Sequence, residues 1–319
     1  GYNDIGFAAA YFLASLRFVQ GLALGGAWDG LASLLALNAP ENRRGWYTMV
    51  PQLGAPIGFM LACLLFAFLI WTLSTADFVT WGWRYPFFVA FSVNVVALFA
   101  RLRLVVTQEF GSLLEQHELE AARVKQTLRV NGRTVLLGAF VPLASYALFH
   151  LVTIFPLSWV QLYTTHSISR FLMVQCLGGL IGAATIMLSG LLADWMGRRL
   201  LLALGAVAIG AGSFITPFFY ASGYINEDII VLAGFAVLGF SFGQCSGALA
   251  ANFRRTYRYT GAALTSDLAW LIGAGFAPLV ALALVESFGL IAVGAYLLSG
   301  AVCTLIALFF NTQLERMRE

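Results

Sequence analysis

The sequence predicts an all-α, polytopic membrane protein, and three observations lead to this fold class. Hydrophobic residues make up 60% of the chain and charged residues only 10%, with a mean hydropathy of +0.84. Apolar runs of about 20 residues, the length of a membrane-crossing helix, recur along the chain. Basic residues collect in alternate connections between these runs. A water-soluble core cannot use this much apolar surface, so we expect the chain to cross a lipid bilayer many times.

Nine apolar runs are long enough to be spanning helices. The first is longer than a bilayer requires, which predicts that it tilts or extends beyond the membrane. The expected spans are residues 6–36, 46–72, 85–105, 134–160, 169–193, 200–221, 229–252, 260–285 and 288–311.

The orientation of the chain follows from its basic residues. Most of the 18 lysine and arginine residues lie in every second connection, and short loops rich in such residues face the cytoplasm. Nine spans then place the N-terminus outside and the C-terminus in the cytoplasm. The basic residues on the expected cytoplasmic side are Arg43, Arg44, Arg101, Arg103, Arg123, Lys125, Arg129, Arg133, Arg198, Arg199, Arg254, Arg255, Arg258, Arg316 and Arg318.

The longest polar connection divides the chain into two parts. Residues 107–133 alternate charged residues with leucine and valine, which predicts a linker helix on the cytoplasmic surface. Three spans precede it in residues 1–106, and six follow in residues 134–311, before a cytoplasmic tail at 312–319. Six spans are half of a twelve-helix transporter. Because the chain opens on Gly1 with no initiator methionine, we expect an N-terminal bundle without its first three helices.

The most specific motif lies in a short polar break between two apolar runs. It consists of Gly190-x-x-x-Asp194-x-x-Gly197-Arg198-Arg199. The break resembles the loop signature of the major facilitator superfamily.

Further stretches resemble the metabolite:proton symporter branch of that superfamily. They are Arg17-Phe18-Val19-Gln20-Gly21, Arg43-Arg44-Gly45-Trp46-Tyr47, Pro51-Gln52-Leu53-Gly54, Trp81-Gly82-Trp83-Arg84-Tyr85-Pro86-Phe87 and Arg258-Tyr259-Thr260-Gly261-Ala262. The resemblance covers nearly the whole chain and implies helices four to twelve of a fold with two six-helix bundles around a central cavity. It also implies alternating access and proton-driven transport of small metabolites, often carboxylates.

Three charged residues, Arg17, Asp29 and Asp267, lie well away from the ends of expected spans, where a charge is costly and usually faces a cavity or a partner. Arg17 is either tied to backbone carbonyls or in contact with a substrate anion or a coupling group. The resemblance implies an acid opposite Arg17 on the first helix, outside this sequence. Asp29 and Asp267 each lie about two turns from the cytoplasmic end. Either carboxylate takes part in proton coupling or gating, or it hydrogen-bonds to helix ends.

Uncharged polar residues form a second set of candidates for substrate or proton contact. His150 lies mid-span, with Tyr146 and Thr153 on the same helical face at i−4 and i+3. This histidine is either structural or a proton relay. Gln52 and Gln244 either bind substrate or bridge helices, and Gln175 favours bridging. The tryptophans Trp28 and Trp270 are assigned to packing.

No enzyme signature occurs in the sequence, because HExxH, GxSxG and P-loop motifs are absent. The four cysteines lie in apolar runs without metal-ligand spacing. We therefore expect neither catalytic residues nor a metal nor a cofactor, and no nucleic-acid partner. The expected partners are a small-molecule substrate, protons and lipid, and the expected complete protein is a monomer in a bacterial inner membrane.

The main hypothesis is a proton-coupled symporter of a small, carboxylate-like metabolite. A non-transporting membrane sensor or scaffold and an inactive transporter fragment are the alternatives. By pseudo-symmetry, the Gly190–Arg199 turn should lie against the other bundle near Arg43 and Arg44. We expect Asp194 there at a helix N-terminus, as part of a conformational gate with Gly190, Gly197, Arg198 and Arg199.

Overall fold

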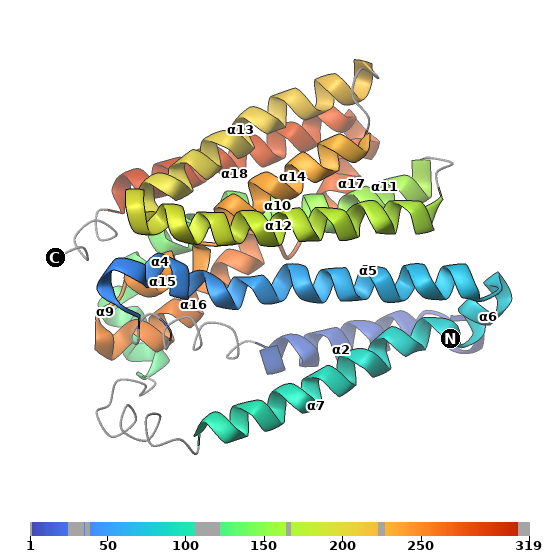
Figure 1. Cartoon of the computed structure of the whole chain (residues 1–319), viewed down its shortest axis with the longest axis horizontal. Helices are drawn as coiled ribbons and strands as arrows, with labels where there is room; N and C mark the ends of the chain where they lie inside the picture. The colour runs from blue at the N-terminus through green and yellow to red at the C-terminus, as the bar shows by residue number, and fades with distance from the viewer. Residues whose placement is uncertain are drawn as a thin grey trace.

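The computed structural model describes residues 2–24, 35, 39–105, 122–163, 167–222 and 227–311, and every element in these ranges is a helix (Figure 1). The elements before the linker are α1 (Tyr2–Ile5), α2 (Ala8–Leu24), η1 (Glu41–Arg43), α4 (Arg44–Met49), η2 (Val50–Leu53), α5 (Gly54–Thr72), α6 (Thr75–Thr80), η3 (Gly82–Arg84) and α7 (Tyr85–Val105). Those after it are α9 (Val124–Phe140), α10 (Leu143–Thr153), α11 (Phe155–Tyr163), α12 (Ile168–Met196), α13 (Arg198–Ser222), α14 (Glu227–Phe242), α15 (Cys245–Ala251), α16 (Arg255–Gly273), α17 (Ala277–Phe288) and α18 (Leu290–Phe310).

Eight helical stretches in the described part of the chain are long and apolar enough to cross a membrane. They match the second to ninth expected spans, with ends that shift by several residues. The first expected span, 6–36, is described only as α2, whose apolar helix is shorter than these eight. The rest of that span, including Asp29, lies outside the described residues.

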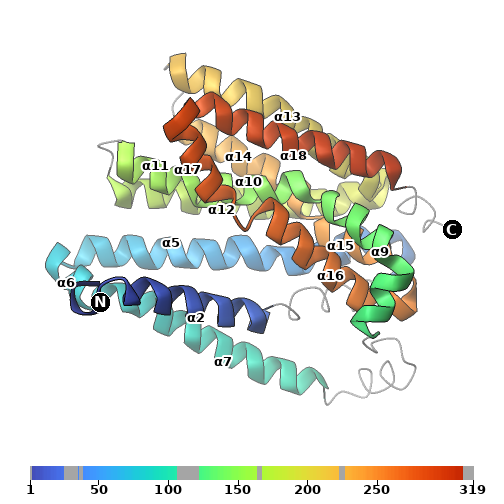
Figure 2. The same ribbon diagram turned by 180° about the vertical axis from the view of Figure 1, so that it is seen from behind.

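The helices after the linker form one packed bundle, and α5 lies along it (Figure 1). The large side chains of its core include Ile186, Leu202, Ile209 and Phe242, each at most 2% exposed. In Figures 1 and 2, α5 lies between α12 and the pair α2 and α7. A Cβ atom on Gly179 of α12 would lie only 2.6 Å from Cγ of Met60 on α5, so these two helices approach closely at this point.

Three of the spanning stretches are interrupted helices. The breaks fall between α10 and α11, between α14 and α15 at Gly243–Gln244, and between α16 and α17 at 274–276. At the last break, the N–H groups of Ala274 and Gly275 both donate to the carbonyl oxygen of Trp270. Such interruptions leave backbone groups without their usual helical partners. Gln244 lies at the second break, and Trp270 lies about one turn before the third.

The last part of the expected linker belongs to helix α9, which continues into the bundle. Helix α9 begins at Val124, inside the expected 107–133 segment, and contains a non-helical residue, Asn131, at φ −121° and ψ 16°. The backbone break therefore lies close to the expected boundary at residue 134. Residues 107–121 lie outside the part of the chain that the structure describes.

Candidate functional site

The turn that carries the Asp194 motif is as short as a helix connection can be. Helix α12 ends at Met196 and α13 begins at Arg198, with Gly197 alone between them. Gly197 has φ 89°, a conformation that glycine adopts without the steric cost of a Cβ atom. The motif glycine thus fixes the angle between the two helices and places Asp194 in the last turn of α12.

The Asp194 carboxylate caps a helix from a distant part of the chain. Its Oδ1 accepts a hydrogen bond from the N–H of Gly45 at 2.5 Å, and its Oδ2 accepts one from the N–H of Trp46 at 3.0 Å. These are the free N–H groups that an N-cap side chain normally satisfies. The N-cap residue of α4, Arg43, makes no such side-chain bond. Asp194 supplies the cap of α4 instead, at the helix N-terminus where we expected this carboxylate.

Two glycines let the two backbones approach at this point. A Cβ atom on Gly45 would lie 2.8 Å from Oδ1 of Asp194 and 2.9 Å from the carbonyl oxygen of Gly190. A Cβ atom on Gly190 would lie 2.7 Å from Cγ of Met49. The first glycine of the motif therefore serves close packing between α12 and α4.

Arg198 makes a second set of hydrogen bonds with α4. Its guanidinium donates to the carbonyl oxygen of Arg44 at 2.9 Å, to Oγ1 of Thr48 at 3.0 Å and to the carbonyl oxygen of Gly247 at 3.4 Å. It thus joins α4 to α13 and α15. The Thr48 side chain is fully buried, so these polar groups need each other as partners.

Gln244 makes a third contact with α4, because its Nε2 donates to the carbonyl oxygen of Gly45 at 3.2 Å. Of its two expected roles, the structure thus places Gln244 in a bridge between helices. Sequence reasoning named Gly45 only as part of the Arg43–Tyr47 motif and did not single out Thr48. We call this set of contacts the clasp, and it consists of Gly45, Trp46, Thr48, Asp194, Arg198, Gln244 and the carbonyl group of Arg44.

The remaining expected gate residues lie beside the clasp. Arg199 donates to the carbonyl oxygens of Leu308 and Phe309 at 3.1 and 3.4 Å, and so binds the C-terminal end of α18 inside its own bundle. The side chain of Arg43 is exposed next to α4. Arg198 therefore connects the parts of the chain before and after the linker, whereas Arg199 binds within the bundle after the linker.

An aromatic cluster lies farther along the bundle and contains two of the expected contact residues. Tyr146 stacks on Trp270 with ring centroids 4.3 Å apart, and Phe149 meets Trp270 edge-on at 5.5 Å. His150 lies 6.1 Å from the same indole, and its buried Nδ1 has no hydrogen-bond partner in the described part of the chain. Trp270 contacts all three of these rings. The sequence predicted only that Trp270 takes part in packing. Asp267, on the same helix, is exposed.

The other expected contact residues are dispersed. Thr153 bonds the carbonyl oxygen of Phe149 and lines a small cavity, of about 310 Å³, between α5 and the bundle. Gln52 is fully buried, and neither amide atom has a partner among the described residues. Gln175 bridges α12 and α10 through the carbonyl oxygen of Val152. Arg17 is exposed on α2, where it bonds Gln20, and the structure does not bring it to the aromatic cluster.

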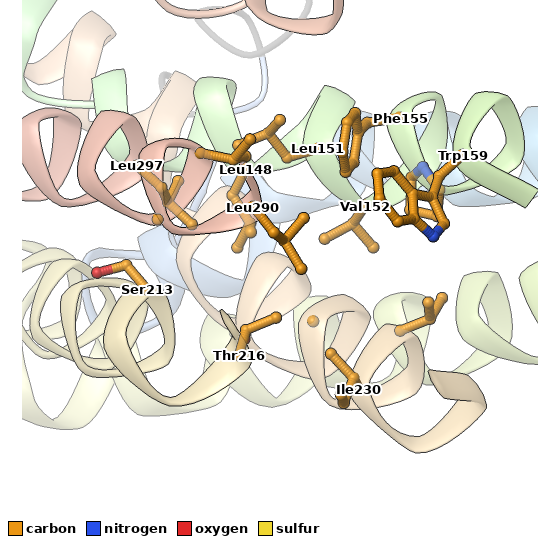
Figure 3. Close-up of a pocket in the computed structure, with 15 residues that line it drawn as sticks. Leu148, Leu151, Val152, Phe155, Trp159, Ser213, Thr216, Ile230, Leu290 and Leu297 are labelled. Atoms are coloured by element: carbon orange, nitrogen blue, oxygen red, sulfur yellow. The ribbon is translucent and has the colours of Figure 1, made fainter. Parts of the chain in front are cut away.

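A larger cavity, about 770 Å³ including its open mouth, lies inside the bundle among α10, α11, α13, α14 and α18 (Figure 3). Its walls are apolar side chains such as Leu148, Phe155 and Leu297. The hydroxyl of Ser213 already donates to the carbonyl oxygen of Gly210 at 2.6 Å. Among the residues that the structure describes, no charged side chain lines either this cavity or the smaller cavity between α5 and the bundle.

Comparison with known proteins agrees with this architecture. The chain is 34% identical to the inner membrane metabolite transport protein YhjE of Escherichia coli (strain K12), over 98% of the chain and 72% of the relative. It is 27% identical to the citrate-proton symporter of Klebsiella pneumoniae, over 96% of the chain and 69% of the relative. The crystal structure of the D-xylose-proton symporter, 19% identical, superposes with a TM-score of 0.58 over 86% of the chain and 64% of that protein.

The family comparison covers most of the chain. Residues 5–267 match the Major Facilitator Superfamily, which includes the motif break at Gly190–Arg199 and the α4 segment bound to it. The relatives are transporters and not enzymes. The chain therefore belongs to the major facilitator superfamily of membrane transporters.

Proposed function

We propose that the protein is a secondary transporter that couples proton movement to the transport of a small organic metabolite by alternating access. The observation that carries the proposal is the clasp, because it joins the parts of the chain before and after the linker through a few polar contacts. In alternating access, such contacts form when the cavity is closed on one side and break when it opens there.

The described conformation is closed at the Asp194 end. We infer from the distribution of basic residues that this end faces the cytoplasm, and that the cavity of the full protein opens outward in this state. The clasp is suited to reversal because each of its hydrogen bonds contributes only about 0.5–3 kcal/mol net.

Proton coupling is supported by the names of a relative and of a structural neighbour, both proton symporters. The bundle after the linker supplies His150 and Asp267 as titratable groups near the aromatic cluster, and Arg17 on α2 remains the candidate for a substrate anion. Relatives named for citrate and shikimate transport both act on carboxylates, which favours a carboxylate-like substrate.

The test is uptake by the full-length protein in proteoliposomes with an imposed pH gradient. Candidate substrates are citrate, shikimate and related carboxylates. Uptake that rises with an inward proton gradient supports the proposal, and uptake that is indifferent to the gradient contradicts the coupling. Ligand-induced thermal stabilisation without any flux would instead support the alternative, a membrane sensor.

Replacement of Arg17 tests its assigned role. Arg17→Ala should abolish uptake while the protein still inserts into the membrane, because the mutation removes the charge that binds the substrate anion. Arg103→Ala, which removes an exposed arginine from the end of α7, is the matched control and should leave uptake near wild type. Wild-type uptake by Arg17→Ala would exclude this residue from the substrate site.

A further inference from the structure

The first two turns of α9 form a short segment at the surface of the protein. The break at Asn131 separates residues 124–130 from the rest of the helix that continues into the bundle. This segment is fastened to α16. Oγ1 of Thr260 donates to the carbonyl oxygen of Ala122 at 3.0 Å, and Gln126 donates to the hydroxyl of Tyr257 at 3.3 Å.

The segment and the turn after it carry three basic residues, Lys125, Arg129 and Arg133, which we call the basic stripe. Lys125 and Arg129 are four positions apart and share a face of the segment, and Arg133 follows just after the break at Asn131. All three side chains are exposed, whereas Thr127, on the opposite face of the segment, is fully buried. Within the described part of the chain, none of the three has an ion pair or hydrogen bond. Among the described residues, the stripe therefore has no acidic partner.

Apolar side chains flank the basic stripe. Val124, Leu128 and Val130 are 51%, 46% and 60% exposed. The sequence from 122 to 140 contains no acidic residue that would repel an anion. Exposed apolar groups beside long basic side chains are typical of a helix in the membrane interface, where the stems lie against acyl chains and the charges reach the headgroups.

The position of the segment agrees with such a contact. Figure 2 shows α9 beside α16, at the end of the molecule where α15 and the last turn of α18 also lie. This is the clasp end, which the basic residues place in the cytoplasm. A cytoplasmic leaflet carries negative surface charge, and the attraction acts on basic residues within about 10 Å of it.

We propose that the basic stripe binds the headgroups of anionic phospholipids in the cytoplasmic leaflet. The ligand is a phosphodiester lipid with net negative charge, such as phosphatidylglycerol, and not a zwitterionic lipid. The proposal uses the orientation assigned above but not the transport activity, so its test stands apart from the uptake experiment. Because the segment is bonded to α16, which also carries Trp270 and Asp267, a lipid bound there contacts the outer end of a helix that leads to the aromatic cluster.

The experiment measures lipid binding to the purified full-length protein by native mass spectrometry. The probes are palmitoyl-oleoyl phosphatidylglycerol and the phosphatidylethanolamine with the same chains. We expect the wild type to prefer phosphatidylglycerol, and the triple variant Lys125→Gln, Arg129→Gln, Arg133→Gln to lower that preference by about tenfold. Lys125→Arg, Arg129→Lys, Arg133→Lys keeps the charges and should keep the preference. Arg103→Gln, which removes a basic residue elsewhere at the same end, should change it little.

Two results would overturn the proposal. One is a triple neutral variant that retains the wild-type preference for phosphatidylglycerol. The other is a wild type with no preference. If the wild type has no preference and the variant Glu115→Gln, Glu118→Gln, Glu120→Gln gains a preference for phosphatidylglycerol, the acidic part of the linker occupies the stripe in place of lipid.

Discussion

Helix α12 is held by two neighbours in two different ways. Against α14 it packs through glycines: a Cβ atom on Gly239 would lie 2.3 Å from the carbonyl oxygen of Gly182, and one on Gly178 would lie 2.2 Å from the ring of Phe235. Against α4 it uses a carboxylate bound to two backbone N–H groups. The first contact is apolar and continuous, whereas the second depends on a few polar groups.

This difference indicates which helices separate during transport. Close apolar packing loses dispersion contacts along its whole length when it opens, and that cost is large in total. A polar contact at a helix end exchanges its hydrogen bonds for bonds to water at little net cost. We therefore expect α12 and α14 to move as one body, and α4 to leave the clasp.

The largest effect is expected within the bundle. Gly239→Ala places a methyl group against a backbone carbonyl that cannot move aside, so we expect a loss of about 3 kcal/mol in the free energy of unfolding. The measurement is thermal unfolding in detergent, followed by tryptophan fluorescence. The matched control is Gly212→Ala on α13, where a Cβ atom would have nothing within 4 Å. Equal melting temperatures for the two variants would contradict the close packing.

A smaller effect is expected from the same change in the clasp. Gly45→Ala forces α4 away from Asp194 and Gly190, at a cost of about 2 kcal/mol that falls on the closed state alone. The fold should survive, and the fraction of open molecules should rise. Spin labels on α4 and α13 of the full-length protein would report the change as a longer distance. Gly58→Ala, at an open position on α5, should leave that distance unchanged.

The two adjacent arginines of the motif provide a matched pair. Arg198→Gln removes the guanidinium that binds Arg44, Thr48 and Gly247, and should favour opening by about 1.5 kcal/mol. Arg199→Gln removes contacts to the end of α18, so it should lower thermal stability without favouring opening. The same distance measurement and the same melting experiment separate the two. Equal opening in both variants would contradict the view that Arg198, and not Arg199, holds the closed state.

Much of this architecture was predictable, because lipid imposes a local rule. A run of apolar residues that is long enough becomes a spanning helix, and the second to ninth spans follow from that rule and from the ends of the runs. The capping position of Asp194 was also predictable, since the motif and the pseudo-symmetry of the repeats place it against the Arg43–Arg44 segment. The spans rest on local signals, whereas the position of Asp194 rests on the motif and on the pseudo-symmetry of the repeats.

The rest of the site depends on contacts between distant residues. Gln244 and Gly45 are 199 positions apart, and no local pattern favours a helix bridge over a substrate contact for a buried amide. The stack of Tyr146 on Trp270 also joins two helices that lie far apart in the sequence. The place of Arg17 relative to the aromatic cluster is likewise a matter of tertiary packing.

The central claim is that the Asp194 carboxylate keeps this end of the molecule closed. Its most direct test is the reactivity of a cysteine at position 52, which is fully buried just inside the clasp, in full-length protein whose four native cysteines are replaced by serine. A membrane-impermeant maleimide is added from the Asp194 side of inside-out vesicles. We predict that Asp194→Ala raises the labelling rate of Gln52→Cys by about tenfold, as expected for the loss of a charged helix cap. Asp77→Ala, which removes an exposed carboxylate bonded to Ser74 in its own turn, should not raise it. An unchanged labelling rate in Asp194→Ala would contradict the account.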